Sequence, residues 1–502
     1  MCGIAGYVGD RESADVLVDA LSKLEYRGYD SAGIAVFDHG NIKVKKCKGR
    51  LANLVEKMDE EGKPQGHVGI GHTRWATHGE PSDINSHPHG NKRVTIVHNG
   101  IIENYKKLKD FLIGEGYSFA SETDTEVAAK LLDYYYDGDP MKTIAKVLSE
   151  IKGSYALGIM FRDFPDEIFA VRKDSPLIVG VGEHENFIAS DVPAIIHYTR
   201  DYYLLDQNEI AVIKKDSVKI YDVHGNEIHK ELNTADWDVD AAEKGGYAHF
   251  MLKEIHEQPD SVKRTIMPRI MDDMPDFSAE GFNPDKLKNY KNIYIVACGT
   301  AMYAGMVGKT MIQNRLHIPV TVAIASEFRY EEPVINEKSM VIVVSQSGET
   351  IDTLEALRLA NKYTKKTLSI VNVKGSSIAR ESSYVLYTHA GPEIAVASTK
   401  AFSVQCAGMY LIALKLAEVN NLMTDEQMKD FCDKFEQAIG TVEEVLKMDD
   451  YIKGISEKIK DTFSAFYLGR GLDYGIACEA CLKLKEISYV NAEAYCAGEL
   501  KH

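Results

Sequence analysis

The chain opens with Met1-Cys2-Gly3-Ile4-Ala5-Gly6, whose small and β-branched residues predict a strand that carries Cys2 at its end. Removal of Met1 leaves a cysteine whose thiol and free α-amino group belong to one residue. An α-amino group has a pKa of about 7.7–8.0, so it can accept the proton of a thiol whose ordinary pKa is about 8.5. Cys2 is therefore a candidate nucleophile with its own base, and an ordinary buried cysteine is the alternative.

Around this segment, residues 1–221 alternate short β-rich runs with amphipathic helices. Strands are predicted at 34–37, 94–97, 156–160 and 210–213. Few crossover helices separate them, which favours antiparallel sheets. The sequence TDTE at 123–126, followed by apolar residues, is typical of a capped helix start. A polar stretch at 222–248 has weak periodicity and predicts a linker between domains.

Polar clusters in this half suit a hydrolase that uses an N-terminal cysteine. The segment GHTRWATHG at 71–79 contains Arg74, which can bind a carboxylate through two hydrogen bonds. Asn99 and Gly100 end a predicted strand, where a side-chain amide and a backbone N–H can form an oxyanion hole. Asp124 can hold a substrate ammonium group. The ordinary alternatives are a surface ion pair, a hairpin turn and an N-terminal helix residue, respectively.

Several histidines lie close to these clusters in the sequence. They lack the helical ligand spacing and the cysteine partners of a metal site, which predicts that they pack or hydrogen-bond locally. These residues are His72, His78, His87, His89 and His98.

The joint order of these motifs resembles class II glutamine amidotransferases, which are N-terminal-nucleophile hydrolases with an αββα sandwich of antiparallel sheets. The motifs are CGI at 2–4, RGYDSAG at 27–33, GHTRWATHG at 71–79, HNG at 98–100 and TDTE at 123–126. The resemblance implies Cys2 as nucleophile, its α-amino group as base, and Asn99 and Gly100 as oxyanion donors. The residues that it implies in binding glutamine or gating its ammonia are Arg74, Trp75, Thr77 and Asp124.

The second half alternates buried strands with helices. Apolar strands are predicted at 293–297 and 340–344, each running into a helix. The second of these turns carries SQSGET at 345–350. Hydroxyl and N–H groups at such a turn can hold a phosphate group, and the helix dipole adds attraction. Helix capping by Ser347 is the alternative.

An internal repeat predicts two similar lobes. The unit that begins at Ile293 is echoed from Phe463, with a strand, a GRG turn, a helix and a second strand. This pattern resembles the sugar isomerase (SIS) family of phosphosugar-binding domains, which implies doubly wound parallel α/β lobes at 249–450 and 451–502. The residues that it implies in phosphosugar binding are Thr300, Ser345, Gln346, Ser347, Thr350, Val396 and Ser398.

A predicted helix in the repeat carries residue types that suit proton transfer. Glu479, Lys483 and Glu486 are spaced i, i+4 and i+7, on one helix face. An exposed ion pair between the first two is the ordinary interpretation. An isomerase moves a proton between two sugar carbons, so Glu486 can act as general base while Lys483 stabilises the enolised intermediate. His502 suits acid–base opening of the sugar ring.

Composition excludes several other classes. The net charge of −17 argues against nucleic acid or an anionic membrane as the main partner. The 8 cysteines have neither metal-ligand nor secreted spacing, which predicts reduced thiols. We expect a cytoplasmic protein, because no signal peptide precedes Cys2 and no apolar run approaches the ~20 residues that span a bilayer.

Together, the two resemblances imply one glutamine-dependent enzyme. Ammonia from L-glutamine would pass internally to fructose-6-phosphate and give glucosamine-6-phosphate and glutamate, in a homodimer and without a metal or organic cofactor. Ala301 stands where a serine commonly contacts phosphate in this family. The chain stops at His502, whereas the family continues to a tail with a functional lysine. The lobe at 451–502 is therefore expected to be incomplete, which could impair synthesis.

Three alternatives remain open at this point. An amidophosphoribosyltransferase would share the first half but needs a phosphoribosyl-diphosphate motif, which the second half lacks. A non-catalytic sugar-phosphate sensor would keep the turn at 345–350 and tolerate loss of Cys2 reactivity. A purely structural chain would show neither glutaminase activity nor phosphosugar binding.

Overall fold

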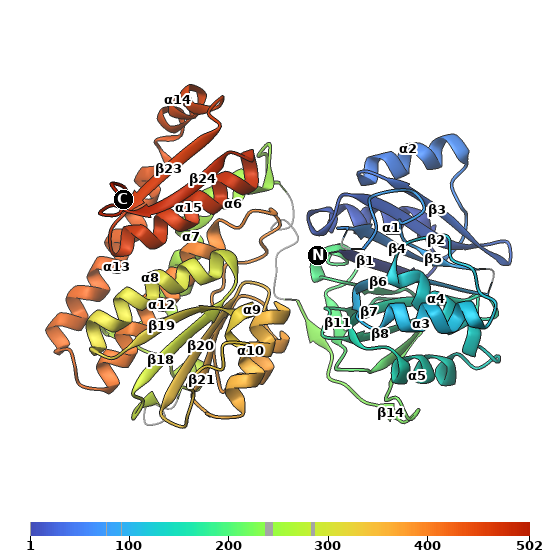
Figure 1. Cartoon of the computed structure of the whole chain (residues 1–502), viewed down its shortest axis with the longest axis horizontal. Coiled ribbons are helices and arrows are strands. Elements are labelled where there is room, and N and C mark those ends of the chain that lie inside the picture. The colour runs from blue at the N-terminus through green and yellow to red at the C-terminus, as the bar shows by residue number, and fades with distance from the viewer. Residues whose placement is uncertain (1, 77, 92, 236–243, 283–286) are drawn as a thin grey trace. The chain divides into compact units, whose positions relative to one another are not determined.

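The computed structural model describes residues 2–76, 78–91, 93–235, 244–282 and 287–502. The chain divides into two compact units, Met1–Ala242 and Glu243–His502. Each unit builds its own sheets and helices around its own hydrophobic core (Figure 1).

One sheet of the first unit is antiparallel and places Cys2 at the start of an interior strand. In spatial order its strands are β15 (Asn233–Thr234), β11 (Asp201–Leu204), β9 (Ile178–Val181), β10 (Asn186–Ala189), β1 (Gly3–Val8), β4 (Val68–Arg74), β2 (Ser31–Asp38) and β3 (Asn41–Lys48). Gly3 of β1 lies opposite Thr73 of β4, and Ala5 lies opposite Ala189 of β10. The nucleophile candidate is therefore flanked by strands on both sides.

The second sheet of this unit is also antiparallel. Its strands run in the spatial order β14 (Glu227–Ile228), β13 (Ser217–Tyr221), β12 (Ile210–Lys214), β8 (Ile168–Lys173), β7 (Gly153–Phe161), β6 (Val94–Ile102) and β5 (His89–Gly90). The two sheets pack face to face, because Ile4 and Ile70 of the first sheet share one buried core with Val97 and Ala156 of the second.

Helices cover the outer faces of both sheets. On the second sheet, Leu108 of α3 (Tyr105–Gly114), Leu131 of α4 (Asp124–Tyr135) and Ile144 of α5 (Pro140–Glu150) share a core with Ile96 of β6. On the first sheet, α1 (Ser13–Ser22) packs on β1 and β4, and α2 (Leu51–Glu61) packs on β2 and β3. The predicted αββα sandwich is confirmed.

The segment predicted as a linker, 222–248, contributes two strands to these sheets. β14 pairs with β13 and β15 pairs with β11. Each is two residues long, too short to leave a periodic pattern in the sequence. Ordered sheet structure therefore continues beyond residue 221.

The second unit is built on a parallel sheet, which confirms the doubly wound fold. Its spatial order is β19 (Val320–Ile324), β18 (Asn292–Ala297), β20 (Ser339–Ser345), β21 (Thr367–Val371) and β22 (Tyr384–Tyr387). One face packs against α7 (Gln258–Ile266), α8 (Gly299–Leu316) and α12 (Lys400–Val419). The other face packs against α9 (Ala325–Phe328), α10 (Ile351–Asn361) and α11 (Ser377–Glu381). Successive residues of β18 alternate between these two cores, as Ile295 and Val296 do.

The remaining elements of this unit flank that sheet in sequence. α6 (Phe250–His256) and the hairpin of β16 (Ile270–Met271) and β17 (Met274–Pro275) precede it. α13 (Asp425–Leu446), α14 (Asp449–Ile459), β23 (Ser464–Gly469), α15 (Leu472–Ser488) and β24 (Asn491–Cys496) follow α12. β23 and β24 pair in parallel and α15 packs on both, which repeats the order of β18, α8 and β19. The internal repeat in the sequence corresponds to these two strand–helix–strand motifs.

Among the described residues, α12 is the one helix long and apolar enough to cross a membrane. Lys400 and Lys415 interrupt its apolar run in the sequence, which is why the run is not evident there. Most of the helix is buried, and Leu411 and Ile412 belong to the core of the second unit. This pattern is typical of a core helix.

Candidate active sites

Cys2 lies where the start of β1 meets the end of β4. Its Sγ accepts a hydrogen bond from the Trp75 N–H at 3.2 Å and can donate to the Trp75 carbonyl oxygen at 3.4 Å. Withdrawal from water raises the pKa of the thiol, whereas the Trp75 N–H and the charge of Arg74 lower it. The thiol therefore needs a base close by before it can react as a thiolate.

Asn99 faces Cys2 from the other sheet. Its Nδ2 donates to the Cys2 carbonyl oxygen at 2.9 Å and to Ser190 Oγ at 2.9 Å. His72 Nε2 faces two acceptors, Asn99 Oδ1 at 2.9 Å and the His98 carbonyl oxygen at 3.0 Å, so this nitrogen carries the proton. That proton fixes the direction of the Asn99 amide and turns its donor end toward Cys2.

Two positions in the backbone around the Cys2 site require glycine. Asn99 and Gly100 lie inside β6, so the alternative of a hairpin turn is wrong. Gly100 has φ +119°, and a Cβ there would lie 2.2 Å from the Ser154 carbonyl oxygen. A Cβ on Gly28 would lie 2.5 Å from the backbone of Arg74. Side chains at these two positions would displace the strands that carry the site.

Arg74 is buried, and part of its guanidinium has no partner in the described part of the chain. Its Nη2 donates to the carbonyl oxygens of His78 and Gly79, whereas Nη1 is buried without a hydrogen bond. Asp124 is the first residue of α4, and its Oδ2 accepts the Ile102 N–H at 2.8 Å. The charges of both residues act on the Cys2 thiol. A cation with unused N–H groups and a carboxylate beside one thiol suit an α-amino acid ligand.

The loop after β4 is held by the RGYDSAG motif. Asp30 donates its N–H to the Arg74 carbonyl oxygen at 3.0 Å and accepts the Ala76 N–H at 2.8 Å. Trp75 is exposed by 39%, and the edge of its ring meets Tyr29 at 5.5 Å between centroids. A partly exposed indole on a held loop is compatible with a gating role. Thr77 lies outside the described residues.

Four of the five histidines form a buried layer behind Asn99. The rings of His72 and His87 stack at 4.1 Å, and those of His87 and His89 lie 5.0 Å apart. His98 Nδ1 is hydrogen-bonded to Thr125 Oγ1 at 2.9 Å. Burial lowers the pKa of each of these rings. The prediction that they bond locally is confirmed, and the described residues contain no group of side chains that could hold a metal ion.

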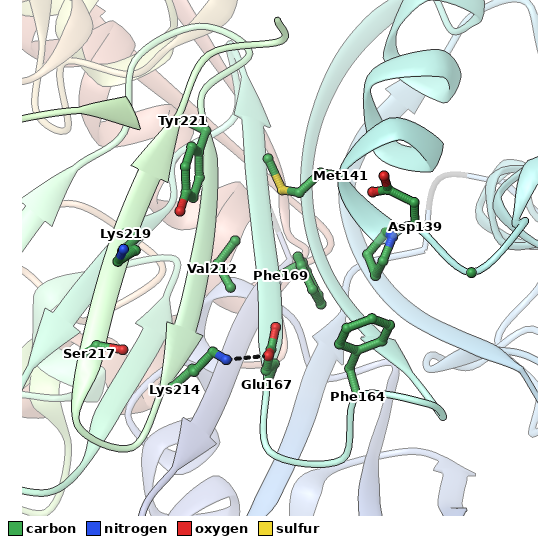
Figure 2. Close-up of a pocket in the computed structure, with 12 residues that line it drawn as sticks. Asp139, Met141, Phe164, Glu167, Phe169, Val212, Lys214, Ser217, Lys219 and Tyr221 are labelled. Carbon is green, nitrogen blue, oxygen red and sulfur yellow. Dashed lines mark ion pairs between the residues drawn. The ribbon is translucent and has the colours of Figure 1, made fainter. Parts of the chain in front are cut away.

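A separate cavity of about 620 Å³ opens at another place on the first unit (Figure 2). Phe164 and Phe169 line its wall, and Lys214 pairs with Glu167 at 2.5 Å. It is bordered by α5, β8, β12 and β13, none of which carries a candidate catalytic residue. The cavity is therefore distinct from the Cys2 site.

In the second unit, the predicted phosphate turns lie at the point where the strand order reverses. β18 is followed in the chain by β19 on one side, and β20 to β22 extend the sheet on the other side. Thr300 is the second residue of α8, which follows β18 after Cys298, and the turn 345–350 begins at the last residue of β20. Ligands of open α/β sheets bind at the carboxyl ends of strands at such a switch point.

The turn 345–350 is organised by its own hydroxyl groups. Ser345 Oγ and Thr350 Oγ1 are hydrogen-bonded at 2.9 Å, and Ser345 Oγ also accepts the Gly348 N–H at 3.0 Å. Ser347 Oγ accepts the Glu349 N–H at 3.2 Å. α10 begins only at Ile351, after Thr350 as N-cap. Capping by Ser347 is therefore wrong as an explanation of this turn.

α15 brings Glu479 and Lys483 into hydrogen-bond contact with Thr300. Lys483 Nζ donates to Thr300 Oγ1 at 3.1 Å and pairs with Glu486 at 2.5 Å, whereas Thr300 donates to Glu479 Oε1 at 3.1 Å. Glu479 is buried, which corrects the expectation of an exposed ion pair with Lys483. Burial raises the pKa of Glu479 to about 7. The sequence predicts that Glu479 lies on the same helix face as Lys483. Its contact with Thr300 could not be predicted, because it depends on how α15 packs on α8. Ala301 is also buried.

The other predicted sugar-site residues vary in their placement. Val396 is exposed by 58%, and Ser398 Oγ donates to Glu393 at 2.7 Å. The Gln346 carbonyl oxygen accepts the Asn372 N–H at 3.1 Å. His502 is exposed and donates its backbone N–H to the Glu499 carbonyl oxygen at 3.0 Å. Within the described residues, no hydrogen bond or ion pair joins the His502 ring to Lys483 or Glu486.

Both units of the chain match families of known proteins. A family model for a glutamine amidotransferase domain matches residues 72–197, and one for a SIS domain matches residues 286–415. The glutamine–fructose-6-phosphate aminotransferase (isomerizing) of Clostridium tetani is 53% identical, over 100% of this chain and 83% of that protein. The chain belongs to the glutamine–fructose-6-phosphate aminotransferase family.

Two further comparisons agree with this membership. The glutamine–fructose-6-phosphate aminotransferase of Thermotoga maritima is 44% identical, over 100% of this chain and 83% of that protein. The C-terminal domain of the aminotransferase from Francisella tularensis aligns with a TM-score of 0.51 and 44% identity, over 52% of this chain and 73% of that chain. Membership in the glutamine–fructose-6-phosphate aminotransferase family removes the alternative of an amidophosphoribosyltransferase.

Proposed function

We propose that this protein transfers the amide nitrogen of L-glutamine to fructose-6-phosphate and releases glutamate and glucosamine-6-phosphate. The 53% identity over the whole chain to a family member supports this reaction. The observation that carries it is the arrangement at Cys2, where an amide oriented by His72 and a buried, partly unpartnered Arg74 surround one thiol. A sensor or a structural chain has no need of that arrangement.

The first half-reaction hydrolyses glutamine. After removal of Met1, the α-amino group of Cys2 takes the thiol proton and the thiolate attacks the amide carbon. The two Nδ2 hydrogens of Asn99 are already donated to the Cys2 carbonyl oxygen and to Ser190 Oγ. The oxyanion therefore replaces one of these two acceptors when it forms. The Gly100 N–H is the second donor. The protonated α-amino group of Cys2 then gives its proton to the leaving nitrogen, and ammonia departs. Water cleaves the resulting thioester to give glutamate.

Substrate contacts follow from the charges around the thiol. Arg74 Nη1 binds the glutamine carboxylate, and the free oxygen of Asp124 accepts from the ammonium group. Trp75 and Thr77 complete this side of the site, with Trp75 gating the exit of ammonia.

The second half-reaction uses the sugar phosphate. Ser345, Gln346, Ser347 and Thr350, together with Thr300, hold the phosphate group, and Val396 and Ser398 contact the sugar. His502 assists ring opening. Ammonia adds to the C2 carbonyl group and water leaves. Glu486 then moves a proton from C1 to C2, while Lys483 stabilises the negative charge that develops.

We also propose that residues 1–221, together with the strands β14 and β15, form the amidotransferase domain and that 249–450 and 451–502 form the SIS lobes. The enzyme acts as a homodimer in the cytoplasm without a metal or organic cofactor. The unpaired state of its 8 cysteines supports a reducing compartment. The net charge of −17 gives no reason to add nucleic acid or a membrane as a partner.

Paired detection of both products tests this proposal. With glutamine and fructose-6-phosphate, we expect glutamate and glucosamine-6-phosphate in equal amounts. Cys2→Ala should abolish glutamate formation and leave fructose-6-phosphate binding unchanged. A Cys2→Ala protein that hydrolyses glutamine at the parent rate contradicts the nucleophile assignment, and glutamate without any aminosugar contradicts the transfer.

A further inference from the structure

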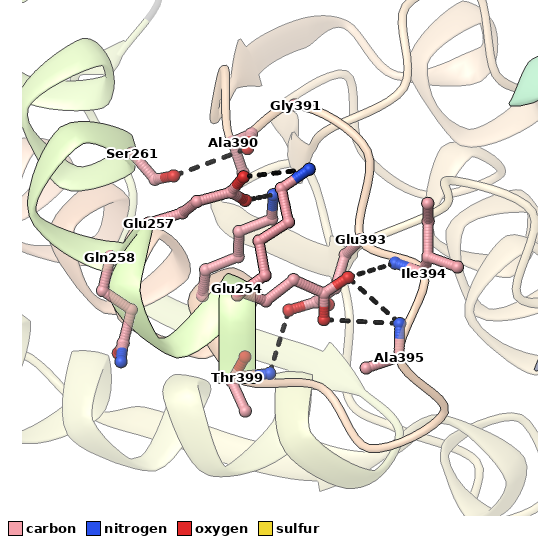
Figure 3. Close-up of polar contacts among 12 residues, drawn as sticks. Glu254, Glu257, Gln258, Ser261, Ala390, Gly391, Glu393, Ile394, Ala395 and Thr399 are labelled. Carbon is pink, nitrogen blue, oxygen red and sulfur yellow. Dashed lines mark hydrogen bonds and ion pairs between the residues drawn. The ribbon is translucent and has the colours of Figure 1, made fainter. Parts of the chain in front are cut away.

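The segment that carries Val396 and Ser398 is held from outside by a carboxylate of α6 (Figure 3). Glu254 Oε1 accepts the Ile394 N–H at 2.5 Å and the Ala395 N–H at 3.1 Å, and its Oε2 lies 3.3 Å from the same Ala395 nitrogen. Glu254 is 2% exposed. One buried side chain therefore satisfies two successive backbone donors immediately before the predicted sugar contacts.

A second carboxylate holds the other end of the same segment. Glu393 accepts the Ser398 hydroxyl at 2.7 Å, the Thr399 N–H at 2.9 Å and the Ala401 N–H at 3.0 Å, at the start of α12. Between these two anchors, Val396 is exposed by 58%. The segment thus has fixed ends and presents its middle to solvent, as a binding loop requires.

The surroundings of Glu254 make its charge sensitive to pH. Burial and the charge of Glu393 raise its pKa to about 7, against the two backbone N–H groups and Lys400, which lower it. Lys400 is buried and pairs with Glu257 at 2.6 Å, so it is already partly neutralised. The carboxylate that anchors the segment therefore gains a proton close to neutral pH.

We propose that Glu254 is a positioning residue for the phosphosugar, because it holds the segment 394–398 in the conformation that presents Val396 and Ser398 to the substrate. This inference rests on the proposed function, which supplies those two sugar contacts. α6 itself carries none of the residues predicted from the sequence. Its contribution becomes visible only where its side chain meets a segment about 140 residues further along the chain.

Acid should weaken this anchoring without weakening the fold through the same group. As the pH falls through about 7, Glu254 becomes neutral, and hydrogen bonds to a neutral carboxyl are weaker than those to a carboxylate. Its pKa in the folded state lies above the ordinary value of 4.5, so proton uptake favours the folded state between these two pH values. As the pH falls through this window, the affinity for fructose-6-phosphate should therefore decrease, whereas the protonation of Glu254 should increase the stability of the fold.

Calorimetric titration of the full chain with fructose-6-phosphate, at pH 8 and pH 6, tests the proposal. Glu254→Ala leaves two buried N–H groups without an acceptor, so we expect its Kd at pH 8 to rise about tenfold. Glu254→Gln keeps one acceptor oxygen and should bind within about threefold of the parent at pH 8. Because Gln does not titrate, its loss of affinity between pH 8 and pH 6 should be smaller than that of the parent.

A matched control separates positioning from general stability. Glu280 is another carboxylate of this unit and pairs with Arg269 at 2.5 Å. Within the described part of the chain, no hydrogen bond or ion pair joins Glu280 to the segment 394–398. Glu280→Gln should lower the thermal unfolding midpoint and leave the Kd for fructose-6-phosphate unchanged. Glutamine hydrolysis should be unaffected in all three variants.

Several results overturn the proposal. It fails if Glu254→Ala binds as tightly as the parent, or if Glu280→Gln weakens binding as much. It also fails if Glu254→Gln and the parent lose affinity for fructose-6-phosphate equally between pH 8 and pH 6. If Glu254→Ala does not fold, this comparison of Glu254→Gln with the parent is the deciding test. Absence of fructose-6-phosphate binding by the parent chain would instead refute the proposed function.

Discussion

Asn99→Ala tests the catalytic arrangement most directly, because the structure allows its effects on catalysis and stability to be calculated separately. The substitution removes one oxyanion donor, which typically lowers kcat by 10²–10³-fold, or about 2.7–4 kcal/mol. That hydrogen bond forms only in the transition state, so the KM for glutamine should change little.

The cost to stability should be modest. His72 Nε2 keeps its bond to the His98 carbonyl oxygen, and Ser190 Oγ keeps the Ile4 N–H at 2.8 Å. The Cys2 carbonyl oxygen loses its donor from Asn99. One unsatisfied acceptor costs about 1–3 kcal/mol of unfolding free energy. Most of the enzyme should therefore remain folded while turnover falls by at least two orders of magnitude.

Steady-state glutaminase kinetics with a denaturant titration of each variant provide the assay. Asn186→Ala is the matched control, because Asn186 is also buried and donates to the carbonyl oxygens of Lys214 and Lys215 at 2.6 and 3.0 Å. It lies opposite Val8, at the end of β1 away from Cys2. Asn186→Ala should lose stability but keep its kcat. A fall in kcat of less than about tenfold in Asn99→Ala, or an equal fall in the control, would refute the oxyanion role.

Three further changes have distinct expected results. Arg74→Lys should raise the KM for glutamine roughly ten- to hundredfold in initial-rate kinetics, because lysine cannot form the paired hydrogen bonds of the guanidinium; an unchanged KM would contradict carboxylate binding. Thr350→Ala removes the partner of Ser345 and should weaken fructose-6-phosphate binding in calorimetry while glutaminase activity stays unchanged; unchanged affinity would leave the turn a structural feature. Burial lowers the pKa of His72 and His89 to about 3, so the unfolded state binds more protons below pH 6.5. Each ring should therefore cost up to about 1.4 kcal/mol of unfolding free energy per pH unit of acidification between pH 6.5 and its folded pKa; urea titrations at pH 7 and 5.5 that give equal free energies would contradict this.

Local patterns carry much of the fold. Short runs rich in Val and Ile predict β6 and β12, and the continuous apolar run at 340–344 predicts the buried strand β20. The strands β14 and β15 escape prediction because each has only two residues, and β15 pairs with β11, which lies far before it in the sequence. Propensity arguments do not detect such contacts.

The site shows the same division between local and distant information. Motif order is enough to propose Cys2, Arg74 and Asn99 as site residues. The role of His72 depends on a hydrogen bond between strands of different sheets, and that of Glu254 on contacts across the second unit. Neither residue stands out by spacing or composition, since its partners are brought to it only by the tertiary fold.

The hydrogen bond from Asn99 to Cys2 also determines when, during folding, the chain becomes able to hydrolyse glutamine. It joins residues 97 positions apart and on different sheets, and Ser190, which shares the same amide, comes a further 91 positions along the chain. Contacts of such separation form late, because the intervening loop must close first. A nascent chain thus exposes its thiol long before it can hydrolyse glutamine. Recovery of glutaminase activity after dilution from denaturant should mark the docking of the two sheets, later than the recovery of helical circular dichroism.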